Sequence, residues 1–463
     1  MEGLLSLLAP SDIVTSQSDP AAYKELTTFW AAQNNLGPQA IVAPSHLQTL
    51  GKVLRYLYDA TQLDFAFRGH GYTSMPTKDI LLSMHKFNSF SYNAKENTVT
   101  VGAGQHWLDV YEAVNKVAPK LTVVGARTPC VSVGGSIITG GFSWLSGDLG
   151  CISDPKNMLD CEVVKYDGSV VWASQEPELL WAIRGGGGGF GAITKAIFRL
   201  HPLAASVYHG TIVAPRSVLP QAIPHVSHFS TSSIDPGISL FMFIEKDKFQ
   251  NMHDVDVREH DALVFHIFDA SGEEHGRQTF KWAFDLPGAQ DFTKMGTILE
   301  VIRIQDRVAA MSGLSKQYWA PMIVPEFTEK QLEDCVQWFT DLDNYGKTIA
   351  DNTYMIFELF CTREGSDPKA MAWPGPRGCR HMLVIGVGCG LDAPAEEEEN
   401  AQKLAKEAPR LLMGDDPRIT PTPNAIEEWT DIPKIYGSNL AKVQELRARY
   451  DPKARFKAHV NIA

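Results

Sequence analysis

Apolar residues follow two different spacings along the first part of this chain. Short apolar runs predict strands at 63–68 and 98–102, whereas the apolar positions in 107–117 have the spacing of an amphipathic helix. Glycine-rich turns separate such elements from residue 41 to about residue 202. We therefore expect an α+β or α/β domain with many tight turns in this part of the chain.

The second part of the chain, from about 204 to 420, has a different pattern. Its apolar runs predict strands that are separated by long helical stretches rather than by regular crossover units. These runs are 238–244, 262–268, 354–360 and 382–387. The pattern predicts an antiparallel sheet backed by helices. The aromatic-rich end of the chain is interpreted as a segment that returns to the first domain.

A run of glycines joins two apolar segments near the end of the first part. Residues 185–191 contain six glycines, and because glycine lacks a Cβ and accepts positive φ, such a backbone passes close to a ligand. The run matches Gly-x-Gly-x-x-Gly from Gly186 to Gly191, but a dinucleotide fingerprint follows a strand and opens a helix. Here a helix-like segment, 176–183, precedes the glycines and a strand-like segment, 192–200, follows them. We expect the glycines to line a cofactor in a different fold.

Composition narrows the class of protein. The chain has 463 residues, of which 44% are hydrophobic and 21% charged, as is ordinary for a globular enzyme with two cores. Its formal net charge of −12 argues against a nucleic-acid partner. The glutamates at 396–399 are interpreted as a solvated helix face. No apolar run approaches the roughly 18–20 residues of a membrane helix, so no membrane partner is expected.

Cysteines and targeting signals indicate a reducing compartment. The seven cysteines include no Cys-x-x-Cys pair and no histidine spacing typical of zinc, so we expect no metal site. The first residues lack the basic and apolar regions of a signal peptide, and the chain contains no Asn-x-Ser/Thr sequon. We expect a cytoplasmic protein with free thiols.

Taken in order, several segments resemble one family, the FAD-binding PCMH-type flavoproteins. The similarity is greatest to the fungal berberine bridge enzyme-like oxidases of the vanillyl-alcohol oxidase superfamily. The segments are 41–44, 67–71, 101–104, 131–135 with 139–146, 167–168, the glycine run, and 436–439 followed by 450–452. The resemblance implies an α+β, two-domain FAD-binding fold. Residues 1–203 and 425–463 would form the FAD-binding domain and 204–424 an antiparallel-sheet substrate domain.

The resemblance also implies which residues contact FAD. Exposed backbone N–H groups in glycine-rich turns and at helix N-termini suit a pyrophosphate. In the family, segments corresponding to 68–73 and 134–141 contact the pyrophosphate and the ring system, while the segment around 189–193 lies near the adenosine half. The FAD-binding residues expected here are Arg68, Gly69, His70, Gly71, Tyr72, Thr73, Gly125, Thr128, Val131, Gly134, Gly135, Thr139, Gly140, Gly141, Ser143, Gly189, Gly191, Ile193 and Asn461.

The chain departs from the family at both positions where relatives attach FAD covalently. The usual attachment histidine falls on Tyr72, and His70 lies two residues earlier. The second attachment cysteine of bicovalent relatives falls on Thr128, with Cys130 displaced by two. A phenol and a threonine hydroxyl do not preserve the usual chemistry. We expect noncovalent FAD, with His70 filling a glycine position and Cys130 packed; linkage through either residue is the alternative.

Three residues are candidates for catalysis, two of them for proton transfer to or from a substrate. Glu358 and His266 each interrupt an apolar strand, where burial without a role or a partner would be costly. Glu358 shares a period-two face with Tyr354 and Phe360. For Glu358, the alternatives are that this face of the strand is partly solvated or that the carboxylate pairs with an arginine. For His266, the alternative is a hydrogen-bonded core histidine. Tyr436, in the motif 436–439, either polarises a substrate oxygen or packs on the flavin.

These observations favour an FAD-dependent oxidoreductase that acts on a small organic molecule in secondary metabolism, with molecular oxygen as electron acceptor. The first alternative is a redox-neutral isomerase or cyclase on the same scaffold, which the loss of the attachment histidine favours. The second is a noncatalytic binding protein without flavin, which the intact glycine clusters oppose. The sequence predicts neither the substrate nor the oligomeric state.

Overall fold

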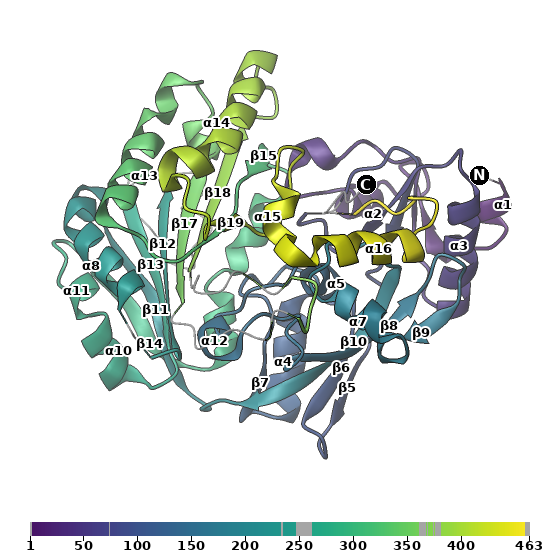
Figure 1. The fold of residues 1–463 in the computed structure, drawn as a ribbon, viewed down its shortest axis with the longest axis horizontal. Coiled ribbons are helices and arrows are strands. Elements are labelled where there is room, and N and C mark those ends of the chain that lie inside the picture. Colours follow the sequence, from purple (N-terminus) through teal and green to yellow (C-terminus); the bar gives the residue numbers. More distant parts are fainter. Residues whose placement is uncertain are drawn as a thin grey trace.

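The computed structural model describes residues 2–73, 75–232, 235–246, 262–360, 367, 369–373, 375 and 381–458. Two lobes are visible in Figure 1. The N-terminal part of the chain and the C-terminal helices lie on the right, and a large sheet covered by helices lies on the left. Among the described residues, no helix has both the length and the apolar character needed to cross a membrane. The predicted α+β class is confirmed.

Two small sheets form the right-hand lobe. The first has the order β1-β2-β4-β3, with β2, β4 and β3 parallel; the second is antiparallel with the order β5-β6-β10-β8-β9, and β7 also pairs with β10. The strands are β1 (Ile13–Val14), β2 (Ala40–Val42), β3 (Phe65–Arg68), β4 (Ile80–Ser83), β5 (Phe90–Asn93), β6 (Thr98–Gly102), β7 (Leu121–Val123), β8 (Met158–Val164), β9 (Val170–Trp172) and β10 (Ala192–Pro202). Strand β3 starts two residues later than predicted.

Helices of this lobe pack on the sheets through apolar stripes. In the helix that follows β2, Leu50, Val53, Leu54 and Leu57 are all fully buried, as a helical spacing of apolar residues requires. The predicted helix 107–117 is confirmed. The helices are α1 (Glu2–Leu5), α2 (Pro20–Leu26), α3 (Leu47–Asp59), α4 (Trp107–Val117), α5 (Val133–Ile138), α6 (Ser146–Leu149) and α7 (Pro177–Ile183).

The left-hand lobe is built on a nine-stranded antiparallel sheet. Its order is β14-β11-β13-β12-β17-β18-β16-β19, with β15 also paired to β18. The strands are β11 (Val207–Pro215), β12 (Ile238–Glu245), β13 (Ala262–Asp269), β14 (Gln290–Gly296), β15 (Lys316–Trp319), β16 (Met322–Val324), β17 (Tyr354–Phe360), β18 (His381–Cys389) and β19 (Thr420–Pro421). The helices are α8 (Leu219–Thr231), α10 (Glu273–Thr279), α11 (Lys281–Phe284), α12 (Ile298–Arg303), α13 (Glu329–Asp341) and α14 (Ala395–Met413).

The central strands of this sheet are covered on both faces. In β17, Met355, Phe357 and Leu359 pack in the core that includes α8, α13 and α14, whereas Tyr354 and Phe360 pack in the core shared with the right-hand lobe. Figure 1 shows α8, α11, α13 and α14 along the outer side of the sheet. Burial of both faces explains why the sequences of these strands are nearly continuous apolar runs. The predicted antiparallel sheet backed by helices is confirmed.

The end of the chain lies against the right-hand lobe. Helices α15 (Ile432–Tyr436) and α16 (Leu440–Tyr450) are drawn in yellow across this lobe in Figure 1. The Asp451 carboxylate accepts a hydrogen bond from the Tyr58 hydroxyl at 3.0 Å. The Phe456 ring lies 5.4 Å from the ring of Tyr58 and 6.1 Å from that of Phe65. The C-terminal segment is thus part of the core of the right-hand lobe.

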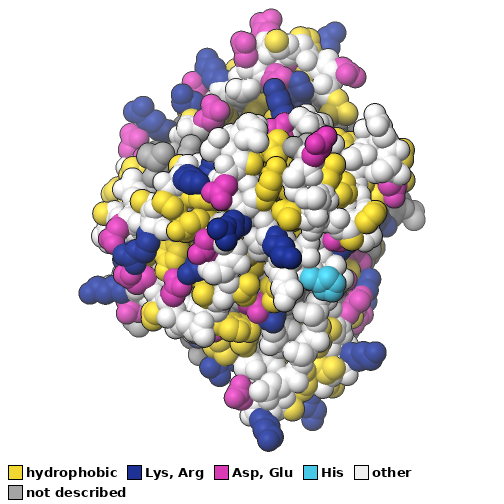
Figure 2. All heavy atoms as spheres, turned by 90° about the vertical axis from the view of Figure 1, so that its right-hand side faces the viewer, with side chains coloured by type: hydrophobic (Ala, Val, Ile, Leu, Met, Phe, Trp, Pro, Cys, Tyr) yellow, Lys and Arg dark blue, Asp and Glu magenta, His cyan; other side chains and the backbone are white. Residues whose placement is uncertain are grey.

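Charge is mixed on the end of the molecule formed by this lobe. Figure 2 shows basic and acidic side chains interspersed there, without a broad field of one sign. A polyanion needs a contiguous basic footprint. On the face drawn in Figure 2, the described residues show no contiguous basic footprint of this kind.

Candidate cofactor and active site

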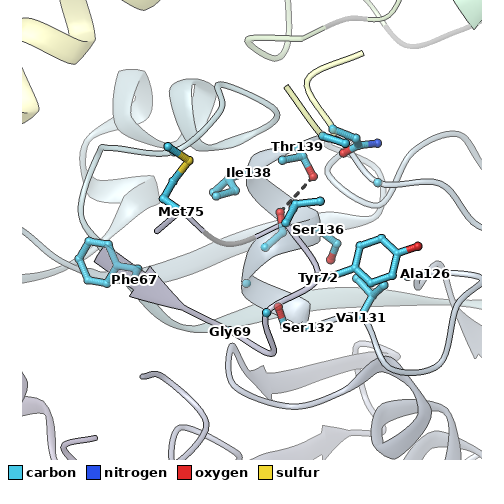
Figure 3. Close-up of a pocket in the computed structure, with 18 of the residues that line it drawn as sticks. Phe67, Gly69, Tyr72, Met75, Ala126, Val131, Ser132, Ser136, Ile138 and Thr139 are labelled. Carbon is cyan, nitrogen blue, oxygen red and sulfur yellow. Dashed lines mark hydrogen bonds between the residues drawn. The ribbon is translucent and has the colours of Figure 1, made fainter. Parts of the chain in front are cut away.

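A long cavity lies between the right-hand lobe and the face of the large sheet that carries Tyr354. Together with its open mouth it contains about 1540 Å³ of space between atoms. Figure 3 shows Phe67 and Met75 at one end of the part drawn, and Tyr72 beside Ala126 and Val131 at the other. The residues expected to bind FAD that line this cavity are Gly69, Gly71, Tyr72, Thr73, Thr128, Val131, Gly134, Gly135, Thr139, Gly141, Gly189, Gly191 and Ile193.

The turn after β3 forms one wall of the cavity. Gly71 has a φ of +80°, a conformation that favours glycine. A Cβ on Gly69 would lie 2.2 Å from the Ser132 Oγ, so the turn and the start of α5 approach each other as closely as glycine allows. The Arg68 guanidinium is buried beneath the turn and donates to the carbonyls of Thr28 and His70 at 3.2 and 3.3 Å. Arg68 shapes the turn and does not line the cavity.

His70 points away from the cavity. Its ring stacks on His106 with centroids 3.4 Å apart, and its Nε2 lies 2.6 Å from the carbonyl oxygen of Gly104. Burial lowers the pKa of His70 to about 3, so the neutral ring donates its Nε2–H to that carbonyl. His70 does not line the cavity, and its assignment to FAD binding stays a prediction. The direction of its ring makes His70 unsuited to covalent attachment.

Helix α5 presents glycines to the middle of the cavity. Gly134 and Gly135 lie in its first turn, and a Cβ on Gly135 would have only the Ser132 Oγ, at 3.2 Å, within 4 Å. The Thr139 hydroxyl, at the other end of the helix, donates to the carbonyl of Gly135 at 3.1 Å (Figure 3). The helix therefore leaves its backbone accessible to a ligand along this side.

The glycine run forms the far wall and is supported by the C-terminal helices. Gly188, Gly189 and Gly191 line the cavity with φ values of +88°, +83° and +130°. Behind them, Arg447 donates to the carbonyl of Gly188, and a Cβ on Gly189 would overlap the Arg447 guanidinium. The run thus needs glycine because it is packed between a ligand cavity and an arginine.

These features fit FAD. A long, partly open cavity with a continuous wall of glycine backbone suits an extended dinucleotide with a pyrophosphate in its middle. In the expected arrangement, Gly189 to Ile193 would hold the adenosine half, Gly134 and Gly135 the pyrophosphate, and Tyr72 with Val131 the ring system. When bound, FAD supplies the acceptor for two electrons taken from a substrate.

Neither position of covalent attachment carries a reactive side chain. Tyr72 lines the cavity, and burial raises the pKa of its phenol well above the usual value. The Thr128 hydroxyl donates to the Gln305 Oε1 at 2.8 Å. The displaced Cys130 does not line the cavity, and burial raises the pKa of its thiol to about 12, so it is not a thiolate at neutral pH.

One end of the cavity is polar. Arg127, Tyr72 and Tyr354 line it together, and the Tyr354 hydroxyl accepts a hydrogen bond from the indole N–H of Trp319 at 3.0 Å. Apolar and aromatic side chains form the adjacent surface, namely those of Trp319, Pro321, Met382, Val384 and Ala425. A largely apolar molecule with one polar end matches this lining.

Glu358 lies directly behind Arg127. Its side chain is fully buried and accepts a hydrogen bond from the Arg127 guanidinium, whose side chain remains 17% exposed. Burial raises the pKa of Glu358 to about 7, while the charge and hydrogen bond of Arg127 lower it. Among the described residues, no hydrogen-bond partner reaches the Glu358 Oε2. The alternative that Glu358 pairs with an arginine is confirmed, and the carboxylate does not itself line the cavity.

The other two candidates for catalysis lie outside the cavity. His266 is fully buried among aromatic rings, with its centroid 4.6 Å from that of Phe243 and 6.3 Å from that of Trp144. Tyr436 is buried as well, and its hydroxyl donates to the carbonyl of Gly185 at 3.1 Å. Both side chains pack inside the fold and neither lines the cavity, so their assignment as catalytic residues stays a prediction.

Three of the residues that the resemblance assigns to FAD binding are packed closely within the fold. A Cβ on Gly125 would meet the Trp107 ring at 2.3 Å, and one on Gly140 would meet the Trp373 ring at 2.4 Å. The fully buried Ser143 accepts a backbone hydrogen bond from Leu145 through its hydroxyl oxygen. None of the three lines the cavity. Asn461 lies outside the described residues.

Comparison with known proteins agrees with this geometry. Residues 38–174 match the model of the FAD binding domain. The chain is 24% identical over 436 residues to an FAD-linked oxidoreductase of Dictyostelium discoideum, covering 92% of this chain and 88% of that protein. It is 25% identical over 461 residues to an FAD-dependent monooxygenase of Penicillium roqueforti, covering 92% and 86%.

The solved structures decide the fold. Berberine bridge enzyme from Eschscholzia californica superposes with a TM-score of 0.78 at 18% identity, covering 98% of this chain and 97% of that chain. The chain is a flavoprotein of the berberine bridge enzyme-like fold. The predicted resemblance, the FAD cofactor and the class of FAD-dependent oxidoreductase are confirmed. In this flavoprotein, Arg127, Tyr354 and Trp319 also line the cavity, and the sequence pattern did not mark them as candidate site residues.

Proposed function

We propose that this flavoprotein oxidises a small, largely apolar organic molecule with FAD that is held without a covalent bond. The observation that carries the proposal is the cavity itself, whose glycine wall fits FAD and whose attachment positions hold Tyr72 and Thr128. Two electrons and two protons leave the substrate, and molecular oxygen, as final acceptor, becomes hydrogen peroxide. Secondary metabolism is the setting that the resemblance to fungal oxidases favours.

The polar end of the cavity is where the substrate's proton leaves. Burial raises the pKa of Glu358 to about 7, which is suited to a general base at neutral pH. Because Arg127 separates the carboxylate from the cavity, we propose that the proton reaches Glu358 through hydroxyl groups and water at this end. The phenols do not compete as bases, because burial raises the pKa of Tyr354 to about 12 and that of Tyr72 well above its usual value.

A second candidate function is redox-neutral chemistry, such as an isomerisation or a cyclisation, in the same cavity. The absence of a histidine or cysteine side chain at the attachment positions favours it, since a covalent bond to the flavin ring generally raises the reduction potential. Tyr72 and Thr128 leave the flavin untethered and thus a weaker oxidant. The same polar end would then move a proton from one atom of the substrate to another.

Anaerobic mixing separates the two functions. The holoenzyme is mixed with a panel of aromatic alcohols, phenols and amines while the visible absorption of the flavin is followed. We expect at least one compound to bleach the flavin band and admission of oxygen to restore it with release of hydrogen peroxide. Product without bleaching supports the redox-neutral function, and a purified protein without bound flavin contradicts both.

A further inference from the structure

The polar end of the cavity contains a buried ion pair with unsatisfied atoms on both partners. In the described part of the chain, neither the Arg127 Nε nor the Glu358 Oε2 has a hydrogen-bond partner. A buried polar atom without a partner costs free energy unless a ligand or water meets it. Glu358 is fully buried, and Arg127 lies between it and the cavity.

An aromatic ring also lies near the guanidinium. Its central carbon lies 5.7 Å from the centroid of the Phe241 ring, on the strand beside Glu358. Apart from Glu358, the polar groups that share this end of the cavity are neutral: the Tyr72 and Tyr354 phenols and the Thr128 hydroxyl. Arg127 is thus the one positive group at this end among the described residues, and Glu358 neutralises it.

We propose that Arg127 anchors an oxygen-bearing group of the substrate that is an anion when bound, an ionised enol or phenol, and that Glu358 takes up the proton that this group loses. The inference rests on the proposed function and assigns the class of substrate. An anion beside Arg127 replaces Glu358 as the counter-charge. The carboxyl group behind it then becomes neutral, because two negative charges at one buried cation repel each other.

The titratable groups around Glu358 support a single-proton event. Burial raises the pKa of the carboxyl to about 7, and Arg127 is the cation that opposes this shift. The charge of Glu358 contributes to the raised pKa of the Tyr72 and Tyr354 phenols, so both stay protonated at neutral pH. On the two adjacent strands, Phe241 and Met382 are the register partners of Glu358. His266 is the register partner of Phe241 on the next strand. Glu358 is therefore the group that exchanges the proton.

Calorimetric titration of the holoenzyme with benzoate, and with benzamide as the neutral match, tests the proposal. A carboxylate probe stays ionised above about pH 5.5. We expect the affinity for benzoate to fall about tenfold from pH 6 to pH 8, as Glu358 ionises, while that for benzamide stays constant. Titrations at pH 8 in buffers of different ionisation heat are expected to show close to one proton taken up per benzoate bound.

Two variants test separately the role of Arg127 as the anchor and that of Glu358 as its counter-charge. Glu358→Gln is expected to bind benzoate about tenfold more tightly than the parent at pH 8 and to lose the pH dependence. Arg127→Met is expected to weaken benzoate binding at least tenfold at pH 6 and to leave benzamide within twofold. Arg127→Met leaves Glu358 buried without its cation and could misfold. The double variant Arg127→Met with Glu358→Gln removes both charges and is expected to bind benzoate as weakly as Arg127→Met does.

Two results would overturn this inference: benzoate binding that does not depend on Arg127, or weaker benzoate binding in Glu358→Gln. Neither result bears on the presence of FAD or on its reduction, which are read from the flavin spectrum. A holoenzyme that is reduced by a neutral substrate but binds benzoate and benzamide alike would keep the proposed function and refute the anionic anchor.

Discussion

Glu358→Gln is expected to lower turnover by about 10²-fold or more, in line with the usual contribution of a general base. The amide keeps the size of the side chain and can still accept from Arg127, but it cannot accept a proton. In the parent protein, kcat/KM for a neutral substrate is expected to rise with pH through about 7, because the base must be ionised and burial raises the pKa of Glu358 to about 7. The variant is expected to lose this ascending limb. Steady-state kinetics from pH 5.5 to 8.5 measure both effects.

Glu162→Gln provides the matched control for this experiment. Glu162 is also a buried carboxylate on a strand, where it accepts from the Thr194 hydroxyl at 2.7 Å and lies 3.2 Å from the Lys195 ammonium, but it does not line the cavity. Its replacement is expected to leave turnover within twofold. Full activity of Glu358→Gln with an unchanged pH profile would remove Glu358 from the mechanism.

Gly135→Leu is expected to give a folded protein that has lost FAD and therefore all activity. Gly135 lies in α5 and lines the cavity, and a side chain there meets only the Ser132 Oγ before it enters the space assigned to the pyrophosphate. Overpacking of this kind costs about 1–3 kcal/mol or more, and about 1.4 kcal/mol corresponds to tenfold in affinity. The ratio of flavin absorbance to protein absorbance after gel filtration measures the loss.

Gly135→Ala separates steric exclusion from damage to the helix. It adds a single carbon, and alanine favours helix over glycine by about 1 kcal/mol. We expect this variant to keep most of its flavin and Gly135→Leu to keep the circular dichroism of the apoprotein. Retention of FAD by Gly135→Leu would show that the cofactor does not run past α5.

The strands of the large sheet could be predicted because their pattern follows directly from burial. Strand β17 was expected at 354–360 and is observed at Tyr354–Phe360, with Glu358 on the predicted face. The role of the glycine run could also be predicted, because six glycines in seven residues allow the backbone to approach a neighbour closely. What the sequence pattern could not show is the arginine behind that approach, because Arg447 is distant in sequence.

The chemistry of the site was only partly predictable because it depends on partners far apart in the chain. Arg127 lies in a loop with no periodic pattern, and its partner Glu358 is 231 residues away. His70 and Tyr436 were assigned from motif positions, yet tight turns and short helices set the direction of a side chain independently of its position in a motif. The ring of His70 stacks on His106, and the hydroxyl of Tyr436 donates to Gly185.

Acid precipitation of the purified holoenzyme tests the central claim most directly, namely that this flavoprotein holds FAD without a covalent bond. Tyr72 and Thr128 stand at the attachment positions, His70 points away from the cavity, and Cys130 lies outside it. We predict a yellow supernatant with the absorption spectrum of free FAD and a denatured protein band without flavin fluorescence. Colour that stays with the pellet would contradict the account, and peptide mapping of the pellet would then identify the residue that carries the flavin.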